Sequence, residues 1–226
     1  ALKGKMAVKR NDVYFRKILV VIQFSFSIIL ICGTFIMGKQ LKYIASKDLG
    51  YNKDHVLSFM MRDMGAHYEA AKANLLSTPG VLAVTRSGWD NIISIGNTTG
   101  DNDFDGKEPN STFMLHPLAV DKDFIPFFGI TMQLGNNFSG AVADSSHIIL
   151  NETAVREAGI KDPIGKKFRI WKNNATIIGV VKDFHFESLK ENVKPAFLKY
   201  DTKFVEKIMV RLNSENQSET IRQIED

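Results

Sequence analysis

The sequence predicts an α+β protein in which one N-terminal transmembrane helix and a helical stalk precede a two-lobe domain outside the cytoplasm. Two features predict this architecture. Residues 18–37 contain no charged side chain, which is typical of a helix that crosses a bilayer. The chain after residue 50 shows a strand, helix, strand pattern near each end and short strand patterns between them. This order indicates an α/β lobe that is interrupted by a mainly β lobe.

The apolar run from Ile18 to Met37 is long enough to span a membrane. At about 1.5 Å per helical residue it reaches roughly 30 Å, the thickness of the hydrocarbon core of a bilayer. A buried helix of a soluble domain is usually shorter. A cleaved signal peptide fits less well, because its apolar core is shorter and ends at a small-residue site. A lipoprotein signal at Cys32 would need a small residue where Ile31 stands.

Charge at the start of the chain predicts the orientation of the span. Six of the 29 Lys and Arg but only one of the 25 Asp and Glu precede it, so the rest of the chain is nearly neutral. Basic residues favour the cytoplasmic side of a span, so we expect a cytoplasmic N-terminus. A nucleic-acid partner is not indicated, because it would need a basic face on the folded domain. The basic residues are Lys3, Lys5, Lys9, Arg10, Arg16 and Lys17.

Cys32 is the only cysteine, and it lies within the span. No disulfide can therefore form within the chain. Secreted eukaryotic domains more often carry paired cysteines. A large extracytoplasmic region without them favours a bacterial envelope protein.

The helix is expected to continue beyond the membrane as a stalk. Leu41, Ile44 and Ala45 extend an i, i+3, i+4 apolar stripe between lysines. We expect the helix to end at Leu49-Gly50, because glycine readily takes the left-handed conformation that closes a helix.

The first and last regions of the domain show the same order of elements. Strands are expected over residues 56–61 and 81–85, with a helix over about 66–77, and later strands over 196–200 and 207–212. A last helix is expected to open at Ser214, with Gln217 completing a capping box. Because the chain stops at Asp226, soon after this helix begins, we expect it to be a fragment of a longer protein.

The middle region is expected to contain short strands, among them residues 112–120 and 175–186. Two short helices interrupt it. Asp121 is expected to cap the first and Asn151 the second, which Gly159 ends.

Three common catalytic motifs are absent from the sequence. No Gly-Lys pair is followed by Ser or Thr, as the phosphate-binding loop of an ATPase requires. Neither a His-Glu-x-x-His zinc motif nor a Gly-x-Ser-x-Gly nucleophile elbow is present. The sequence therefore predicts no catalytic residue and no cofactor.

The strongest metal candidate is the acidic run Asp101, Asp103 and Asp105, followed by Gly106. It matches the first half of a calcium loop. The twelfth position is Thr112 rather than the bidentate Glu of that motif. An acidic surface turn is the preferred interpretation, and a cation bound with help from distant ligands is the alternative.

Asp183, His185 and Glu187 alternate along the last expected strand of the middle region and would share one face of it. Two carboxylates and an imidazole could bind a metal or act as acid and base. The preferred interpretation is a solvated strand face or a polar cluster that fixes the next loop.

Several stretches taken together resemble the FtsX-like ABC transporter permeases with a MacB-type periplasmic core domain, especially those common in Bacteroidetes. Their order and spacing along nearly the whole chain carry the resemblance. The stretches are Phe15-Arg16-Lys17-Ile18-Leu19-Val20, Leu49-Gly50-Tyr51-Asn52-Lys53-Asp54, Val120-Asp121-Lys122-Asp123-Phe124-Ile125, Leu150-Asn151-Glu152-Thr153-Ala154, Asp162-Pro163-Ile164-Gly165-Lys166 and Ile178-Gly179-Val180-Val181-Lys182-Asp183-Phe184-His185-Phe186.

The resemblance implies a porter-like α/β lobe, built from the first and last regions, with the mainly β lobe inserted. It also implies a strand and turn without a metal at Asp105-Gly106-Lys107, and a structural strand over residues 183–187 that leads back to the first lobe. The expected segments are a cytoplasmic N-terminal segment (1–17), the transmembrane helix (18–37), the stalk (38–50), the first half of the porter-like lobe (51–87), the inserted lobe (88–187) and the second half of the porter-like lobe (188–226).

The resemblance further implies a non-catalytic permease subunit in the bacterial inner membrane, with residues 38–226 in the periplasm. Such permeases pair with an ABC ATPase subunit or domain and usually form a dimer with a second permease copy or half. They transmit ATP-driven motion to the periplasm, in some cases through a periplasmic adaptor and an outer-membrane channel. Gln23, Ser27 and Thr34 are then candidates for contacts with other membrane helices, beside lipid.

A different class remains open from the sequence: the extracytoplasmic ligand-binding domain of a single-span sensor. The two classes differ in what would follow Asp226. A permease predicts the rest of the lobe and about three more apolar spans, whereas a sensor predicts one span and a cytoplasmic signalling domain.

Overall fold

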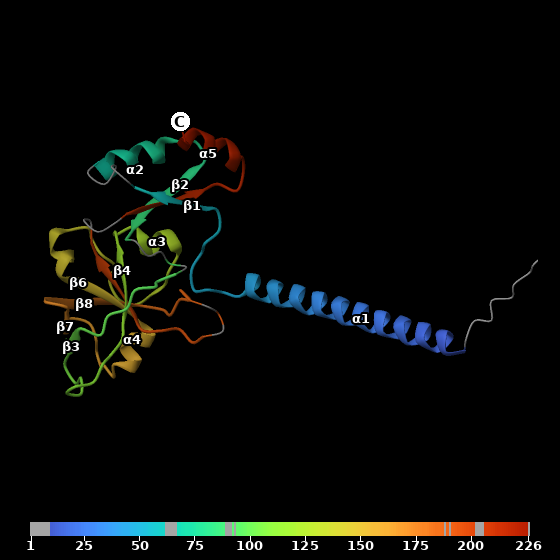
Figure 1. Ribbon diagram of the computed structural model, residues 1–226. Coiled ribbons are helices and arrows are strands. Elements are labelled where there is room, and N and C mark those ends of the chain that lie inside the picture. Colours follow the sequence, from blue (N-terminus) through green and yellow to red (C-terminus); the bar gives the residue numbers. More distant parts are fainter. Residues whose placement is uncertain are drawn as a thin grey trace, which may run out of the picture. The chain divides into compact units, whose positions relative to one another are not determined.

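A computed structural model describes residues 10–61, 67–88, 92, 94–187, 189, 191–201 and 206–225. The chain divides into two compact units, Ala1–Asp48 and Leu49–Asp226 (Figure 1). The first contains one long helix, and the second is a domain built around one large sheet. The α+β class predicted from the sequence is therefore confirmed.

Helix α1 (Arg10–Ser46) has 37 residues. Its apolar run contains no proline that would interrupt the backbone hydrogen bonds. The helix ends at Ser46, before the predicted end at Leu49-Gly50. The reason lies in the domain, where the Leu49 carbonyl accepts a hydrogen bond from the His185 amide at 2.8 Å. Gly50 does take a positive φ of 80°, although it lies beyond the helix.

Ten strands form the sheet of the domain. Their order is β1-β10-β2-β4-β9-β6-β8-β7-β3, with β5 paired to β8. The strands are β1 (Val56–Met60), β2 (Val81–Ser87), β3 (Asn102–Phe104), β4 (His116–Val120), β5 (Met132–Gly135), β6 (His147–Asn151), β7 (Lys167–Ile170), β8 (Asn173–Val181), β9 (Ala196–Tyr200) and β10 (Lys207–Leu212).

Strands β1, β10 and β2 form one end of the sheet, and two helices cover one face of them (Figure 1). The helices are α2 (Tyr68–Ser77) and α5 (Gln217–Glu225). The side chains of Ile208, Val210 and Leu212 point from β10 into the core beneath these helices. Burial of each such side chain contributes about 1.5–3 kcal/mol. These elements come from the first and last regions, as the sequence predicted for the α/β lobe.

The remaining strands enclose two further cores. The larger one surrounds the short helix α3 (Phe124–Phe128), whose four apolar side chains are buried. The other lies around β6, β7 and β8 and includes Phe168 and Ile177. Strand β9 pairs with β4 and β6, so it joins the strands of the middle region. The residue limits of the two lobes stay a prediction.

Besides the end of α1, the predicted strand start at residue 112 was wrong, because β4 begins at His116. Two further predicted boundaries also differ. Strand β8 ends at Val181, five residues before the predicted end. Helix α5 begins at Gln217 rather than at Ser214, so the predicted capping box does not form. Instead, the Ser214 hydroxyl bonds to the Asn213 side chain at 3.4 Å. The predicted start of α2 at residue 66 lies outside the described residues.

The two short helices that the sequence predicted in the middle region are present as α3, which follows β4, and α4, which follows β6, and the 3-10 helix η2 (Val142–Ser146), which was not predicted, lies between them. Helix α4 (Glu152–Glu157) is capped by Asn151, whose Oδ1 accepts a hydrogen bond from the Ala154 amide at 3.0 Å. Gly159 takes a φ of 64° just after the helix. Asp121 acts differently at α3, where its Oδ1 accepts from the Asp123 amide at 3.1 Å, one residue before the helix.

Candidate functional site

Helix α1 contains a candidate membrane span. Within the described residues, the structure shows one helix long and apolar enough to cross a bilayer, Tyr14–Ile44, and its apolar stretch is not buried in the protein. Exposure of so much apolar surface to water is unfavourable, whereas lipid accommodates it. The structure therefore supports a membrane-anchored protein.

Three polar residues of the span, Gln23, Ser27 and Thr34, lie on one stripe of α1, and Ser25 lies on the opposite side. Gln23, Ser27 and Thr34 are four and seven residues apart, which places them within about 40° around a helix of 3.6 residues per turn. The Ser27 hydroxyl donates to the Gln23 carbonyl and the Thr34 hydroxyl to the Leu30 carbonyl, both at 2.9 Å. The hydroxyl protons are thus satisfied within the helix. Contacts of this stripe with other membrane helices stay a prediction.

The segment that follows α1, residues 49–54, is named here the connecting segment. Its backbone is held by three separate parts of the domain. The His185 amide donates to the Leu49 carbonyl at 2.8 Å, and the Asn52 amide donates to the Phe128 carbonyl at 2.7 Å. The ring of Tyr51 packs edge to face on Phe128, with centroids 5.9 Å apart. Burial raises the pKa of Tyr51 to about 12.

Arg211 of β10 is the third contact of the connecting segment, and the sequence analysis missed it. Its guanidinium donates to the carbonyls of Asp54 (2.7 Å), Asn52 (2.9 Å) and Phe127 (2.7 Å). It also lies 4.9 Å from the centroid of the Phe127 ring. Burial lowers the pKa of Arg211, but the group stays charged in proteins. An arginine within the apolar strand sequence 207–212 was the signal that could have found it.

A buried polar cluster joins α2, β2 and the turn before α3. Its centre is the Asp121 carboxylate, which is 4 % exposed. It accepts hydrogen bonds from the Tyr68 hydroxyl at 3.0 Å and the Thr85 hydroxyl at 2.5 Å. The Arg86 guanidinium lies 3.9 Å from the centroid of the Tyr68 ring. Burial raises the pKa of Asp121, although the two hydroxyl donors lower it in part.

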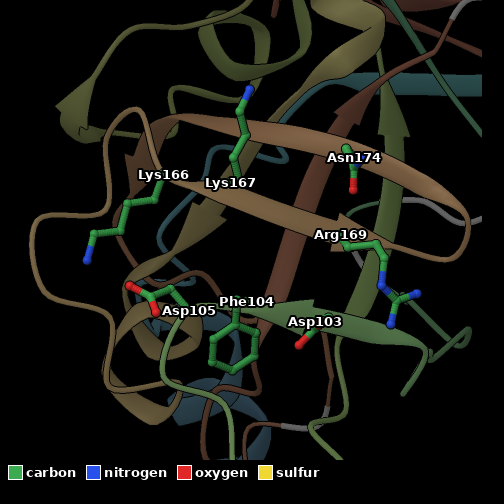
Figure 2. Close-up of a pocket in the computed structure, with 7 residues that line it drawn as sticks. All are labelled: Asp103, Phe104, Asp105, Lys166, Lys167, Arg169 and Asn174. Atoms are coloured by element: carbon green, nitrogen blue, oxygen red, sulfur yellow. The ribbon is translucent and has the colours of Figure 1, made fainter.

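The acidic run of the predicted calcium loop lies in and beside an open hollow of about 560 Å³. Figure 2 shows Asp103 and Asp105 on either side of Phe104, in a hollow that is also lined by the cations Lys166, Lys167 and Arg169, with the Lys167 side chain pointing away from both carboxylates. The third carboxylate, Asp101, accepts from Arg169 Nη1 at 2.9 Å. Among the described residues, no group of three or more His, Cys, Asp or Glu is placed to hold a metal. This arrangement favours the acidic surface turn over the calcium loop.

Adding excess calcium or EDTA to the purified protein is expected to leave its melting temperature unchanged. A ligand that binds only the folded state would raise it. Asp101→Asn is expected to cost at most about 1 kcal/mol with or without calcium, because it removes an exposed ion pair. A calcium-dependent rise in melting temperature that Asp103→Asn abolishes would establish the cation site.

Asp183, His185 and Glu187 do not share a strand face, because β8 ends at Val181. The Asp183 carboxylate instead accepts from the Thr153 amide (2.8 Å) and hydroxyl (2.7 Å) at the start of α4. This bonding draws the chain away from the sheet. Glu187 pairs with Lys194 at 2.5 Å. The three residues thus have separate structural contacts, and the polar-cluster interpretation fits them better than a metal site does.

Comparisons with known proteins identify the family. A family model of the MacB-like periplasmic core domain matches residues 22–226. The periplasmic region of MacB from Actinobacillus actinomycetemcomitans has a similar fold, with a TM-score of 0.53 and 13% sequence identity over 77% of this chain and 82% of that chain. The extracellular domain of the noncanonic ABC-type transporter YknZ from Gram-positive bacteria gives a TM-score of 0.49 and 14% identity over 75% of this chain and 83% of that chain.

A comparison with curated protein sequences finds no match. The structural likeness to the MacB region shows a shared fold, and the family model covers most of the chain, from within α1 to the end of α5. The chain therefore belongs to the family of the MacB-like periplasmic core domain, the periplasmic part of MacB/FtsX-like ABC transporter permeases.

Proposed function

We propose that this chain contributes one membrane helix and the periplasmic domain that follows it to a permease that couples ATP hydrolysis in the cytoplasm to work in the periplasm. The ATPase is a separate subunit or a fused domain, and the chain itself is not catalytic. Its N-terminus is cytoplasmic, residues 38–226 are periplasmic, and the permease acts with a second copy or half. A periplasmic adaptor or an outer-membrane channel is a further partner. Family membership favours this function over a single-span sensor.

The observation that carries the proposal is the continuity from α1 into the domain. At about 1.5 Å per residue, the helix of 37 residues is roughly 55 Å long, and the hydrocarbon core takes up only about 30 Å of it. Lys47 and Asp48 alone separate Ser46 from Leu49, whose carbonyl is bonded within the domain. Two extended residues allow the distance between the end of α1 and Leu49 to change by only about 7–10 Å. A larger displacement of α1 would therefore move the domain.

The first experiment asks whether an ATPase is associated with the protein. The full-length protein, purified in mild detergent, is expected to retain an ATPase subunit or to show the activity of a fused one. Failure to recover ATPase activity in either form would contradict the proposal.

The second experiment lengthens the connection. A flexible Gly-Ser insertion of about ten residues between Lys47 and Asp48 is expected to abolish nucleotide-dependent movement of the domain. The end-to-end distance of such a linker can change at little cost in free energy, so movement of α1 would no longer pull on the domain. ATPase activity of the complex should persist. The matched control places the same insertion after Gly106, in a turn where a side chain would meet open space. Movement that survives the first insertion would contradict transmission through this connection.

A further inference from the structure

The connecting segment and Arg211 carry an inference that rests on the proposed function. Within six residues of chain, the segment is bonded to three parts of the domain that lie far apart in the sequence. These contacts come from His185 after β8, from Phe128 of α3 and from Arg211 of β10. A force on Leu49 is therefore shared among several elements rather than passed to β1 alone.

Arg211 holds this arrangement together. A guanidinium offers five donors in a rigid planar fork, so it can bond several carbonyls at once. Here Nη1 donates to Asp54, and Nη2 donates to both Asn52 and Phe127. A weaker contact of 3.3 Å joins Nη1 to the Asn52 side-chain oxygen. Hydrogen bonds from a charged donor are about twice as strong as those between neutral groups.

The contacts of Arg211 connect two cores of the domain. Its strand, β10, pairs with β1 and β2 beneath α2 and α5. Phe127 and Phe128 belong to α3, whose side chains fill the core of the middle region. The Arg211 side chain thus links the connecting segment to a strand of one core and to the helix of the other, which the segment also contacts directly through Asn52 and Tyr51.

We propose that Arg211 and the connecting segment form the coupling point at which movement of α1 is transmitted to both cores of the periplasmic domain. Arg211 is a positioning residue in this role. The alternative is that it only stabilises the start of β1, in which case its loss would lower stability without changing the response to nucleotide.

The test measures distances in the full-length permease with its ATPase, after Cys32→Ser. Spin labels are attached at Leu82→Cys of β2 and Val142→Cys of η2, which are 60% and 91% exposed. In the parent protein we expect the distance between the labels to differ between the nucleotide-free and ATP-bound states. With Arg211→Ala we expect the nucleotide-dependent population shift to fall about tenfold or more, since hydrogen bonds to a charged group have an effect of that size on an equilibrium constant.

Two further variants separate coupling from stability. Arg211→Lys keeps the charge but not the planar fork, so we expect a partial loss of the shift in a protein that still folds. Arg222→Ala removes an exposed arginine that pairs with Glu219 within α5, and should leave the shift unchanged. ATPase activity should persist in all three variants.

The outcomes distinguish the two proposals. A parent protein without any nucleotide-dependent distance change would contradict the proposed function itself. A parent protein that moves, together with Arg211→Ala and Arg211→Lys variants that move equally, would overturn the coupling point and leave the proposed function standing. Protection of the Asn52 and Leu212 amides from hydrogen exchange, lost in Arg211→Ala and kept in Arg222→Ala, would support the coupling point.

Discussion

Asp121→Ala is expected to lower the free energy of unfolding by about 2–4 kcal/mol, because it leaves buried hydroxyl groups without their acceptor. The Tyr68 and Thr85 hydroxyls both donate to Asp121, as does the Asp123 amide at 3.1 Å. Asp121→Asn is expected to cost less than about 1 kcal/mol, since the amide oxygen still accepts and the Tyr68 hydroxyl can accept from the amide nitrogen. Urea unfolding of the full chain in detergent, followed by tryptophan fluorescence, measures both changes.

The stability difference between Asp121→Asn and the parent protein should depend on pH. Burial raises the pKa of Asp121 above its ordinary value of 3.8. The folded state then binds the proton more tightly than the unfolded state does. The resulting stabilisation is complete below the unfolded pKa and is lost as the pH rises through the folded pKa. The asparagine stays neutral, so the variant should gain stability relative to the parent as the pH rises from the unfolded pKa through the higher folded pKa of Asp121.

The groups that face Asp121 come from three elements. They determine how far its pKa is raised and therefore how strongly the stability difference depends on pH. They are Tyr68 and Lys72 of α2, Thr85 and Arg86 of β2, and Asp123 of the turn before α3. Asp105→Asn, an exposed carboxylate in a turn, is the control and should show no comparable change. A loss of stability of Asp121→Asn relative to the parent as the pH rises would contradict this prediction.

The strands and helices at the two ends of the domain could be predicted because their signals are local. Ile208, Val210 and Leu212 alternate with residues of the opposite face, as a strand with two different faces requires. The apolar run of α1 is also a local signal. Such patterns report which side chains are buried, and they do so without knowledge of distant partners.

The end of β8 could not be predicted in the same way. Phe184 and Phe186 alternate with polar residues and are 1% and 2% exposed, as they would be in a strand. The chain nevertheless leaves the sheet at Val181, because Asp183 bonds to Thr153 of α4. Alternation therefore predicted the burial correctly and the strand pairing incorrectly, since pairing depends on a competing contact 30 residues away.

Arg211 was missed for a related reason. Its acceptors lie at Phe127, 84 residues away, and at Asn52, 159 residues away. The position of β9 between β4 and β6 likewise follows from pairings between distant strands. Contacts of this kind depend on the assembled topology, which the local pattern of residues does not contain.

Asn151→Ala is expected to destabilise the domain by about 2–4 kcal/mol, because one side chain makes three hydrogen bonds, two of them buried, at the meeting point of β6, α4 and β9. Its Oδ1 accepts from the Ala154 amide at 3.0 Å and the Ala196 amide at 2.9 Å, and its Nδ2 donates to the Lys194 carbonyl at 2.9 Å. Loss of a helix cap costs about 1 kcal/mol, and a buried amide left without an acceptor about 1–3 kcal/mol more.

The cap and the strand contact can be separated with a second substitution at the same position. Asn151→Asp keeps an oxygen for both amides but turns the donor toward Lys194 into an acceptor, so its loss of stability should be smaller than that of alanine and larger than zero. Asn174→Ala, at an exposed position of β8, is the matched control and should change stability by less than about 0.5 kcal/mol. If Asn151→Ala cost no more than Asn174→Ala, the buried hydrogen bonds of Asn151 would not support the junction of β6, α4 and β9. In Asn151→Ala the Ala196 amide has lost its acceptor, and an unpaired buried amide is costly. We therefore expect this amide to exchange its hydrogen faster in the variant than in the parent protein.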